Sequence, residues 1–561
     1  MPAAAVEIVG ESGGVLPIRR GRLPPEVEPG YHWLTMADGR RRQLVVSPGR
    51  CHPPPDLRQW GWATQLYALR SQRSWGMGDL GDLRLLARWS SRLGAQTVAI
   101  NPLHAALPVR PQQASPYYPS SRRFRNPLYI CVEEAPGARG LGGLAEWATT
   151  GAELNQQSVI DRDSIFALKM EALASCCRAF TGSAPERERR QWDAYRRSSG
   201  DSLRRYATFC ALAERFGGGW RSWPTEFRLP TSASVHRFAA DRMERVEFHE
   251  WLQWVLDRQL ARAAAVGVGL IQDLAVAVDP DGADAWDWQD LLAEGVRVGA
   301  PADEFNTQGQ DWGMPPFDPH RLRGAGYRPW METIRAAMGH AAGLRVDHVL
   351  GLFRMWWIPA QATAADGAYV RYRYQDLLDI LALESWRAGA FVVGEDLGTS
   401  EPLVRRELAR RSIMSYRVLW FEKGSPATYP TRSMAAVTTH DLPTVAGLWS
   451  GSDLADQERL RLNPNRAGTS AMRRRLARLA GTSAGAGTDT DVISGVYARL
   501  ARAPSLLRAA TLEDACAERR RPNMPGTAEA WPNWSIPLPM RLEQLQKDPL
   551  ATRIADSMRQ G

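Results

Sequence analysis

Short apolar runs of strand length recur along the chain from Trp62 onward. Each run is followed by a polar or ionisable residue, then by a loop, and later by a stretch with the spacing of an amphipathic helix. This pattern predicts seven strands, at residues 64–69, 97–104, 267–274, 344–349, 390–397, 415–422 and 435–442. An eighth strand is expected near residues 531–539.

The same pattern predicts the fold class. Helical spacing over residues 86–93 ends at Gly94, and helical spacing over residues 331–338 ends at Gly339. Strands that alternate with helices predict a parallel sheet in an α/β protein. Because polar residues end several different strands, we expect a (β/α)₈ TIM barrel, whose active site lies at the carboxyl ends of its strands. A doubly wound open sheet is the alternative, in which such residues gather at one switch point.

The chain is longer than a barrel requires. A (β/α)₈ barrel needs roughly 250 residues, so the 561 residues predict large insertions. The largest is expected at about residues 143–266, which have a mainly helical pattern. Residues 1–55 have a different pattern of apolar and polar residues: GYHWLTM and RQLVVSP resemble two strands joined by the turn ADGR. We therefore expect a short N-terminal β-rich remnant, followed by the catalytic barrel with its insertions at residues 56–561.

Composition and charge exclude several classes of protein. The net charge is +9, but 67 of the 70 basic residues are arginines scattered along the chain, which favours solvated faces over a nucleic-acid groove. The longest apolar stretch, residues 263–271, is far below the roughly 18 residues that a membrane span needs. The first residues lack the basic and apolar regions of a secretion signal. We expect a cytoplasmic protein with no membrane or nucleic-acid partner.

Metal and cofactor chemistry lacks its usual sequence signals. The six cysteines form no CxxC pair, and the nine histidines form no HxxxH pair. No stretch resembles a phosphate-binding P-loop. The sequence therefore lacks the parts of a zinc site and of phosphoryl transfer, and predicts no metal. The 22 tryptophans are compatible with stacking on sugar faces, although tryptophan also fills cores.

Three predicted strand ends each carry a carboxylate. These are Asp347 in RVDHVLGL, Glu395 in VVGEDLGT and Asp441 in TTHDLPT. A retaining glycoside mechanism needs one ionised carboxylate as nucleophile and one protonated carboxyl as acid and base. Each residue alone could instead cap a following helix. Their shared position at strand ends favours a catalytic set.

The residues around these carboxylates suggest which one is ionised. Arg345 lies two residues before Asp347, hence on the same side of the strand, where its charge would keep Asp347 ionised. Glu395 follows two valines and would lie near a negative nucleophile, so we expect it to hold a proton.

Longer motifs resemble those of a known family. They run from about residue 30 to residue 539 and include RSWGMGDLGDL, NPLHA, SPYYPSSRRFRNPLYI, GQDWGMPPFDPH, LRVDHVLGLFRMWWIP, GAYVRY, VVGEDLGT, THDLPT and NMPGT. They resemble the 4-α-glucanotransferases called amylomaltases or disproportionating enzymes, in the bacterial maltodextrin-utilisation form. The resemblance implies a (β/α)₈ barrel with inserted subdomains and no obligatory cofactor. It also implies that Asp347 is the nucleophile, Glu395 the acid/base, and Asp441 a third carboxylate that binds sugar hydroxyls.

The resemblance implies a set of sugar-binding residues as well. Tyr117 resembles the aromatic platform under the sugar, and Gln310 and Trp312 match a loop that folds over the bound glucan. The full predicted set is His104, Ser115, Tyr117, Asp273, Gln310, Trp312, Arg345, His348 and His440.

Three functions are compatible with these sequence features. The first is transfer of a segment of an α-1,4-glucan, such as a maltodextrin, to the 4-hydroxyl of an acceptor glucan or glucose. The second is an amylase-like hydrolase with water as acceptor, and the third is a non-catalytic glucan-binding protein. Binding alone needs no acid beside a nucleophile, which argues against the third; the oligomeric state is left open.

Overall fold

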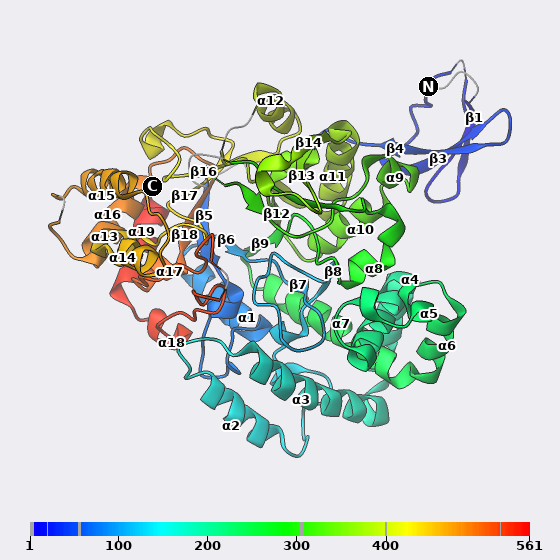
Figure 1. The fold of residues 1–561 in the computed structure, drawn as a ribbon, viewed down its shortest axis with the longest axis horizontal. Coiled ribbons are helices and arrows are strands. Elements are labelled where there is room, and N and C mark those ends of the chain that lie inside the picture. The colour runs from blue at the N-terminus through cyan, green and yellow to red at the C-terminus, as the bar shows by residue number, and fades with distance from the viewer. Residues whose placement is uncertain are drawn as a thin grey trace.

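A closed barrel of eight parallel strands forms the centre of the molecule (Figure 1). The computed structural model describes residues 5–19, 21–53, 58–302, 308–398, 401–483, 485–527 and 529–561. The barrel strands are β5 (Gln59–Thr64), β6 (Thr97–Ile100), β9 (Gly269–Leu274), β12 (Gly343–Val346), β15 (Phe391–Gly394), β16 (Met414–Val418), β17 (Ser433–Ala436) and β18 (Leu507–Thr511). They pair in chain order, and β18 closes the barrel against β5. The predicted (β/α)₈ fold is confirmed.

Two of the predicted strands are wrong in position. The first barrel strand covers residues 59–64, and the chain after Gln65 turns into a 3₁₀ helix whose residues 66–68 are all buried. The apolar residues 66–68, which were expected in the strand, therefore pack into the core as a helical turn. The ring of Trp62, from the strand itself, stacks on that of Trp89 at 5.5 Å.

The eighth strand is β18 and not residues 531–539. The latter segment contains three prolines, at positions 532, 537 and 539. Proline has no backbone N–H to donate to a sheet ladder. The apolar character of residues 531–539 comes instead from buried side chains, such as Trp531 and Leu538.

Helices cover the outside of the barrel. α1 (Leu80–Arg92) begins at a capping box formed by Asp79 and Asp82, and α10 (Arg328–Ala337) ends before Gly339, as the sequence predicts. The other helices outside residues 143–266 are α8 (Ala283–Asp287), α9 (Pro319–Gly324), α11 (Tyr374–Ala388), α12 (Pro402–Arg410), α13 (Val445–Ser450), α14 (Ser452–Arg459), α15 (Arg466–Ala480), α16 (Asp489–Leu500), α17 (Leu512–Ala515), α18 (Leu542–Leu545) and α19 (Pro549–Gln560).

The insertion between β6 and β9 is helical, as predicted. It contains α2 (Leu144–Leu154), α3 (Arg162–Ser183), α4 (Glu186–Phe216), α5 (Thr225–Arg228), α6 (Ala233–Asp241) and α7 (Met243–Ala264). α7 packs on both α4 and α1, so it joins the insertion to the barrel wall. Figure 1 shows these helices gathered along one side of the barrel. The division of the chain into residues 1–55 and 56–561 stays a prediction.

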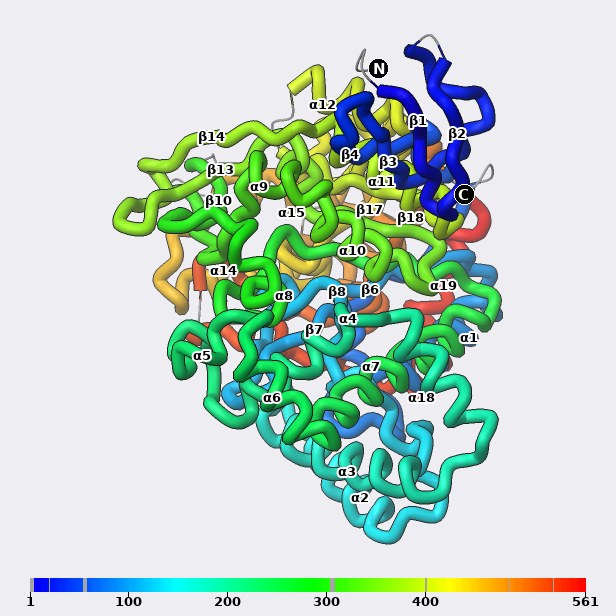
Figure 2. Tube along the Cα trace, turned by 90° about the vertical axis from the view of Figure 1, so that its right-hand side faces the viewer, coloured from blue at the N-terminus to red at the C-terminus, as the bar shows by residue number. Residues whose placement is uncertain are grey.

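Smaller sheets lie around the barrel. The N-terminal sheet contains β1 (Ala5–Val9), β2 (Val15–Pro17), β3 (Gly30–Met36) and β4 (Arg41–Val46), and the β3–β4 pair is the predicted hairpin. Figure 2 shows this sheet at one corner, beside α11. Tyr31 Oη donates to Glu384 Oε1 of α11 at 2.7 Å, which anchors it there.

A second antiparallel sheet adjoins the barrel mouth. It contains β10 (Val296–Ala300), β11 (Gln310–Asp311), β13 (Arg354–Pro359) and β14 (Ala368–Arg371). β7 (His104–Ala105) and β8 (Ser121–Arg125) form a short separate pair.

Candidate active site

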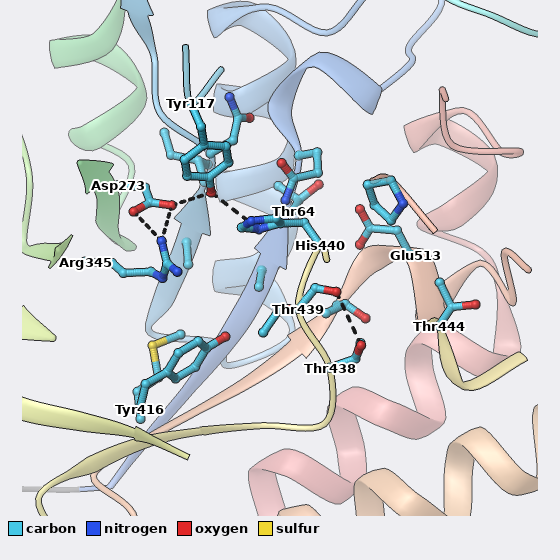
Figure 3. Close-up of a pocket in the computed structure, with 18 residues that line it drawn as sticks. Thr64, Tyr117, Asp273, Arg345, Tyr416, Thr438, Thr439, His440, Thr444 and Glu513 are labelled. Carbon is cyan, nitrogen blue, oxygen red and sulfur yellow. Dashed lines mark hydrogen bonds and ion pairs between the residues drawn. The ribbon is translucent and has the colours of Figure 1, made fainter. Parts of the chain in front are cut away.

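Four of the predicted site residues, Tyr117, Asp273, Arg345 and His440, meet in one pocket of the barrel (Figure 3). β12 pairs with β9 so that Arg345 lies opposite Asp273, and it pairs with β15 so that Arg345 lies opposite Val393. In a parallel ladder, opposite residues point to the same side of the sheet. This register brings Arg345 and Asp273 together inside the barrel, at a pocket that Tyr117 and His440 also line.

Arg345 bridges two carboxylates. Its Nη1 donates to both oxygens of Asp273, at 2.7 and 2.8 Å, and its Nη2 donates to Asp347 Oδ1 at 2.8 Å. Tyr117 Oη donates to Asp273 Oδ2 at 2.7 Å. Burial and the negative charge of Asp347 raise the pKa of Asp273 despite the opposing effect of Arg345. The predicted Arg345–Asp347 pair is therefore present, and the planar guanidinium holds both groups in place.

Glu395 lies beside Asp347 and has a different environment. Its Oε2 accepts the backbone N–H of His348 at 3.0 Å, and its Oε1 accepts that of Leu397 at 2.8 Å. His348 directly follows Asp347 and has a left-handed φ of 44°. Burial and the charge of Asp347 raise the pKa of Glu395 to about 7. One carboxylate is thus paired with an arginine, and its neighbour holds a proton near neutral pH.

Asp441 forms the other wall of the site. His440 Nε2 lies 3.3 Å from Asp441 Oδ2, and Asn523 Nδ2 donates to Asp441 Oδ1 at 2.7 Å. Desolvation opposes the charge, but His440 and Asn523 outweigh it and lower the pKa of Asp441 to about 2. Its side chain is 48% exposed, so this carboxylate is accessible from solvent.

Aromatic rings form an apolar wall between these groups. The ring of Tyr117 stacks on that of His440 at 4.8 Å and lies 5.3 Å from that of Trp534. On the opposite side, Trp312 meets His348 edge-on at 5.3 Å and donates from Nε1 to Gln310 Oε1 at 3.0 Å. The structure therefore brings Trp312 and Gln310 to the site.

Two predicted sugar-binding residues contact backbone. His104 Nε2 accepts the N–H of Ala275 at 3.3 Å, just after β9, and burial lowers the pKa of His104 to about 3. Ser115 Oγ accepts the N–H of Tyr117 at 3.2 Å. These contacts shape the segments that carry Asp273 and Tyr117, and the predicted sugar contacts of His104 and Ser115 stay predictions.

Sequence reasoning missed two polar residues of the site. Glu513 follows β18 and lines the same pocket, and it was overlooked because the eighth strand was expected elsewhere. The signal was available, since the strand-length segment LLRAAT, residues 506–511, directly precedes Leu512 and the acidic pair Glu513 and Asp514. Asn523 belongs to the NMPGT motif, and nothing in its neighbourhood in the sequence indicates its role.

The described ranges contain neither a cluster of metal ligands nor a membrane-spanning helix. There, no group of three or more His, Cys, Asp or Glu side chains is arranged to hold a metal ion. No helix in the same ranges is both long and apolar enough to cross a bilayer.

Comparison with known proteins identifies the family. The family model described as 4-alpha-glucanotransferase matches residues 64–543. The chain belongs to the 4-alpha-glucanotransferase family. Of the three predicted functions, the glucanotransferase is confirmed over the amylase-like hydrolase and the non-catalytic binding protein.

Individual relatives agree with this assignment. The 4-alpha-glucanotransferase of Mycobacterium tuberculosis (strain ATCC 25618 / H37Rv) is 42% identical over 586 residues, covering 96% of this chain and 80% of the relative. That of Haemophilus influenzae is 35% identical, covering 77% of this chain and 67% of the relative. The crystal structure of amylomaltase from Corynebacterium glutamicum matches with a TM-score of 0.87 and 33% identity, over 99% of this chain and 86% of that chain.

Proposed function

We propose that this glucanotransferase works by a retaining double displacement on α-1,4-glucans such as maltodextrins, with Asp347 as nucleophile and Glu395 as acid/base. The observation that carries the proposal is the contrast between two adjacent carboxyls. Asp347 accepts a hydrogen bond from Arg345, whereas the pKa of Glu395 is raised to about 7. In this chemistry, the environments of the two carboxyl groups determine which one is the acid and which one is the nucleophile.

The two steps follow from these assignments. An Asp347 oxygen attacks the anomeric carbon while Glu395 gives its proton to the glycosidic oxygen, so that bond breaks and the first glucan leaves. A glycosyl ester on Asp347 remains. The Glu395 carboxylate then takes the proton from the 4-hydroxyl of a second glucan. That oxygen attacks the same carbon and the ester bond breaks, which restores both residues.

Asp441 and the aromatic wall hold the sugar during these steps. The open Asp441 carboxylate is placed to accept hydrogen bonds from sugar hydroxyls, and the rings of Tyr117 and His440 offer a face for the sugar ring. Hydrogen bonds that strengthen as the ring distorts lower the barrier to the reaction.

Incubation with pure maltotriose tests the proposed acceptor. Transfer should convert maltotriose into glucose and a ladder of longer maltodextrins, which chromatography of the products resolves. Shortening of the chains with no longer products would contradict transfer to a glucan hydroxyl.

The proton on Glu395 has a consequence for pH dependence. The acid must be protonated in the first step, and its raised pKa keeps the proton up to about pH 7. We expect kcat/KM for the donor to be steady below this value and to fall about tenfold per pH unit well above it. Initial rates with maltotriose from pH 5 to 9 measure this.

A second buried acid provides the control for this profile. Burial also raises the pKa of Glu513 to about 7. In Glu513→Gln the alkaline fall should persist, because Glu395 is unchanged. Loss of the fall in Glu513→Gln, or a steady kcat/KM up to pH 9 in the unmodified enzyme, would contradict the role given to Glu395.

Trp312 is proposed to favour a glucan acceptor over water. Trp312 directly follows β11 and lies between Gly309 and Gly313, which both have positive φ. A covered site excludes water from the glycosyl ester. Trp312→Ala is expected to raise the ratio of hydrolysis to transfer severalfold and to raise KM for the acceptor, as measured by glucose release and product chromatography.

Trp33 provides the matched control for Trp312. It lies on β3 of the N-terminal sheet and is 46% exposed. Trp33→Ala should leave the ratio of hydrolysis to transfer unchanged. An unchanged ratio in a folded Trp312→Ala protein would remove Trp312 from acceptor control.

A cytoplasmic location and the absence of a nucleic-acid partner stay predictions from the sequence. Binding to duplex DNA, if measured, should vanish at moderate salt, because scattered arginines make few simultaneous phosphate contacts.

A further inference from the structure

The NMPGT motif, residues 523–527, lies against the segment that carries His440 and Asp441. Asn523 makes two contacts with it: Nδ2 donates to Asp441 Oδ1 at 2.7 Å, and the backbone N–H donates to the His440 carbonyl at 3.1 Å. Arg521 Nη1 donates to the Asp441 carbonyl at 3.3 Å. One short segment thus holds both the backbone and the carboxylate of this part of the site.

The position of Asn523 is itself fixed by contacts on either side. Arg521 forms a buried ion pair with Asp453, with Nε 2.6 Å from Oδ1. On the other side, Met524 N–H donates to Asn533 Oδ1 at 2.8 Å, and Trp534 N–H donates to the Pro522 carbonyl at 2.8 Å. Buried, paired groups of this kind restrict motion, so Asn523 presents its amide in a defined direction.

We propose that Asn523 is a positioning residue that orients the Asp441 carboxylate toward the sugar by donating Nδ2–H to Oδ1. With Oδ1 held in this way, Oδ2 beside His440 stays turned to the cleft for a sugar hydroxyl. The inference rests on the proposed role of Asp441 as the third carboxylate of the site.

An amide suits this task because it is a donor with no charge of its own. The charged groups that act on Asp441 are His440 at 3.3 Å, Arg345 across the cleft, and Arg521 on the Asp441 carbonyl. The Asn523 hydrogen bond also helps to lower the pKa of Asp441. A neutral donor on Oδ1 fixes the carboxylate direction without adding a second ion pair to the one that Oδ2 forms with His440.

Two substitutions at position 523 separate this role from simple support of the fold. Asn523→Ala removes the donor, and kcat should fall about 10- to 100-fold with KM changed by less than about threefold, since the lost interaction matters most in the transition state. Asn523→Asp keeps the shape but places a second carboxyl against Asp441. At pH 7 its loss should exceed that of Asn523→Ala, because like charges then face each other.

The pH dependence of the two variants is the decisive readout. When the pH falls toward 5, the two facing carboxyls of Asn523→Asp should share one proton and restore a donor. Its activity relative to the unmodified enzyme should therefore rise at least about tenfold between pH 7 and pH 5. The relative activity of Asn523→Ala should stay constant over the same range, because alanine has no titrating group.

Thr527 provides the matched control within the same segment. Its Oγ1 donates to the Met524 carbonyl at 2.7 Å and accepts from Asn533 Nδ2 at 2.9 Å, without touching Asp441. Thr527→Val loosens the segment but keeps the Asn523 contact, so kcat should stay within about threefold. Circular dichroism of each variant establishes that it is folded.

Asp441→Asn in the same assay distinguishes failure of the proposed role of Asp441 from failure of the inference about Asn523. If Asp441→Asn retains near-normal turnover, the proposed role of Asp441 fails and Asn523 has nothing to position. If Asp441→Asn is inactive but Asn523→Ala stays within twofold of the unmodified kcat, the inference about Asn523 alone is overturned. It is also overturned if Asn523→Ala and Asn523→Asp lose activity equally at every pH, or if Thr527→Val loses as much.

Discussion

Asp347→Asn, Glu395→Gln and Asp441→Asn are each expected to lower turnover of maltotriose at least about a thousandfold in a folded protein. Asp347 supplies the bond to the sugar and Glu395 supplies the proton. Asp441 binds the hydroxyls of the distorted ring. Because these three act as one unit, the loss of any one should cost nearly as much as the loss of all. Product chromatography measures the rate, and circular dichroism verifies the fold.

Asp396 is a demanding control for this result. It directly follows Glu395, but its side chain is buried and its Oδ1 accepts the N–H of Tyr416 at 2.9 Å. Asp396→Asn can still accept that hydrogen bond, so turnover should fall by less than about tenfold. Near-normal turnover of any of the three carboxylate variants would remove that residue from the mechanism. A thousandfold loss in Asp396→Asn would indicate that the loss of turnover in the carboxylate variants comes from a disturbed strand and not from the loss of a catalytic group.

The barrel could be predicted because six of its eight strands end in a visible change of residue type near the predicted position. Asp347, Glu395 and Asp441 all follow apolar runs, and the alternation of side chains along a strand placed Arg345 beside Asp347. These features depend on near neighbours in the chain. The prediction succeeded wherever the local pattern and the tertiary structure impose the same constraint.

Contacts between distant segments were beyond this reasoning. The bond from Arg345 to Asp273 joins residues 72 positions apart and depends on the register of β9 and β12. The bond from Asn523 to Asp441 spans 82 positions through a loop without regular structure. Glu513 was missed for a different reason. Apolar side chains near residue 531, such as Trp531 and Leu538, suggested a strand there, so the eighth strand was expected in the wrong place.

Glu395→Gln is also expected to accumulate a covalent intermediate. An activated glycosyl fluoride needs little acid assistance to leave, so Asp347 can still form its ester in this variant. Glutamine cannot accept a proton from the acceptor hydroxyl, so the second step slows. The glycosyl-enzyme should then rise from an undetectable level to most of the protein, as measured by intact mass spectrometry.

Mapping this intermediate tests the assignment of the nucleophile most directly. Glu395→Gln is incubated with an α-glycosyl fluoride, quenched in acid, digested and sequenced by mass spectrometry, alongside a variant that also carries Asp347→Asn. The account predicts one glycosyl unit on the peptide that contains Asp347 and none in the double variant. A glycosyl unit on Asp441, Asp273 or another carboxylate, or no adduct in a folded Glu395→Gln protein that still consumes the fluoride, would contradict it.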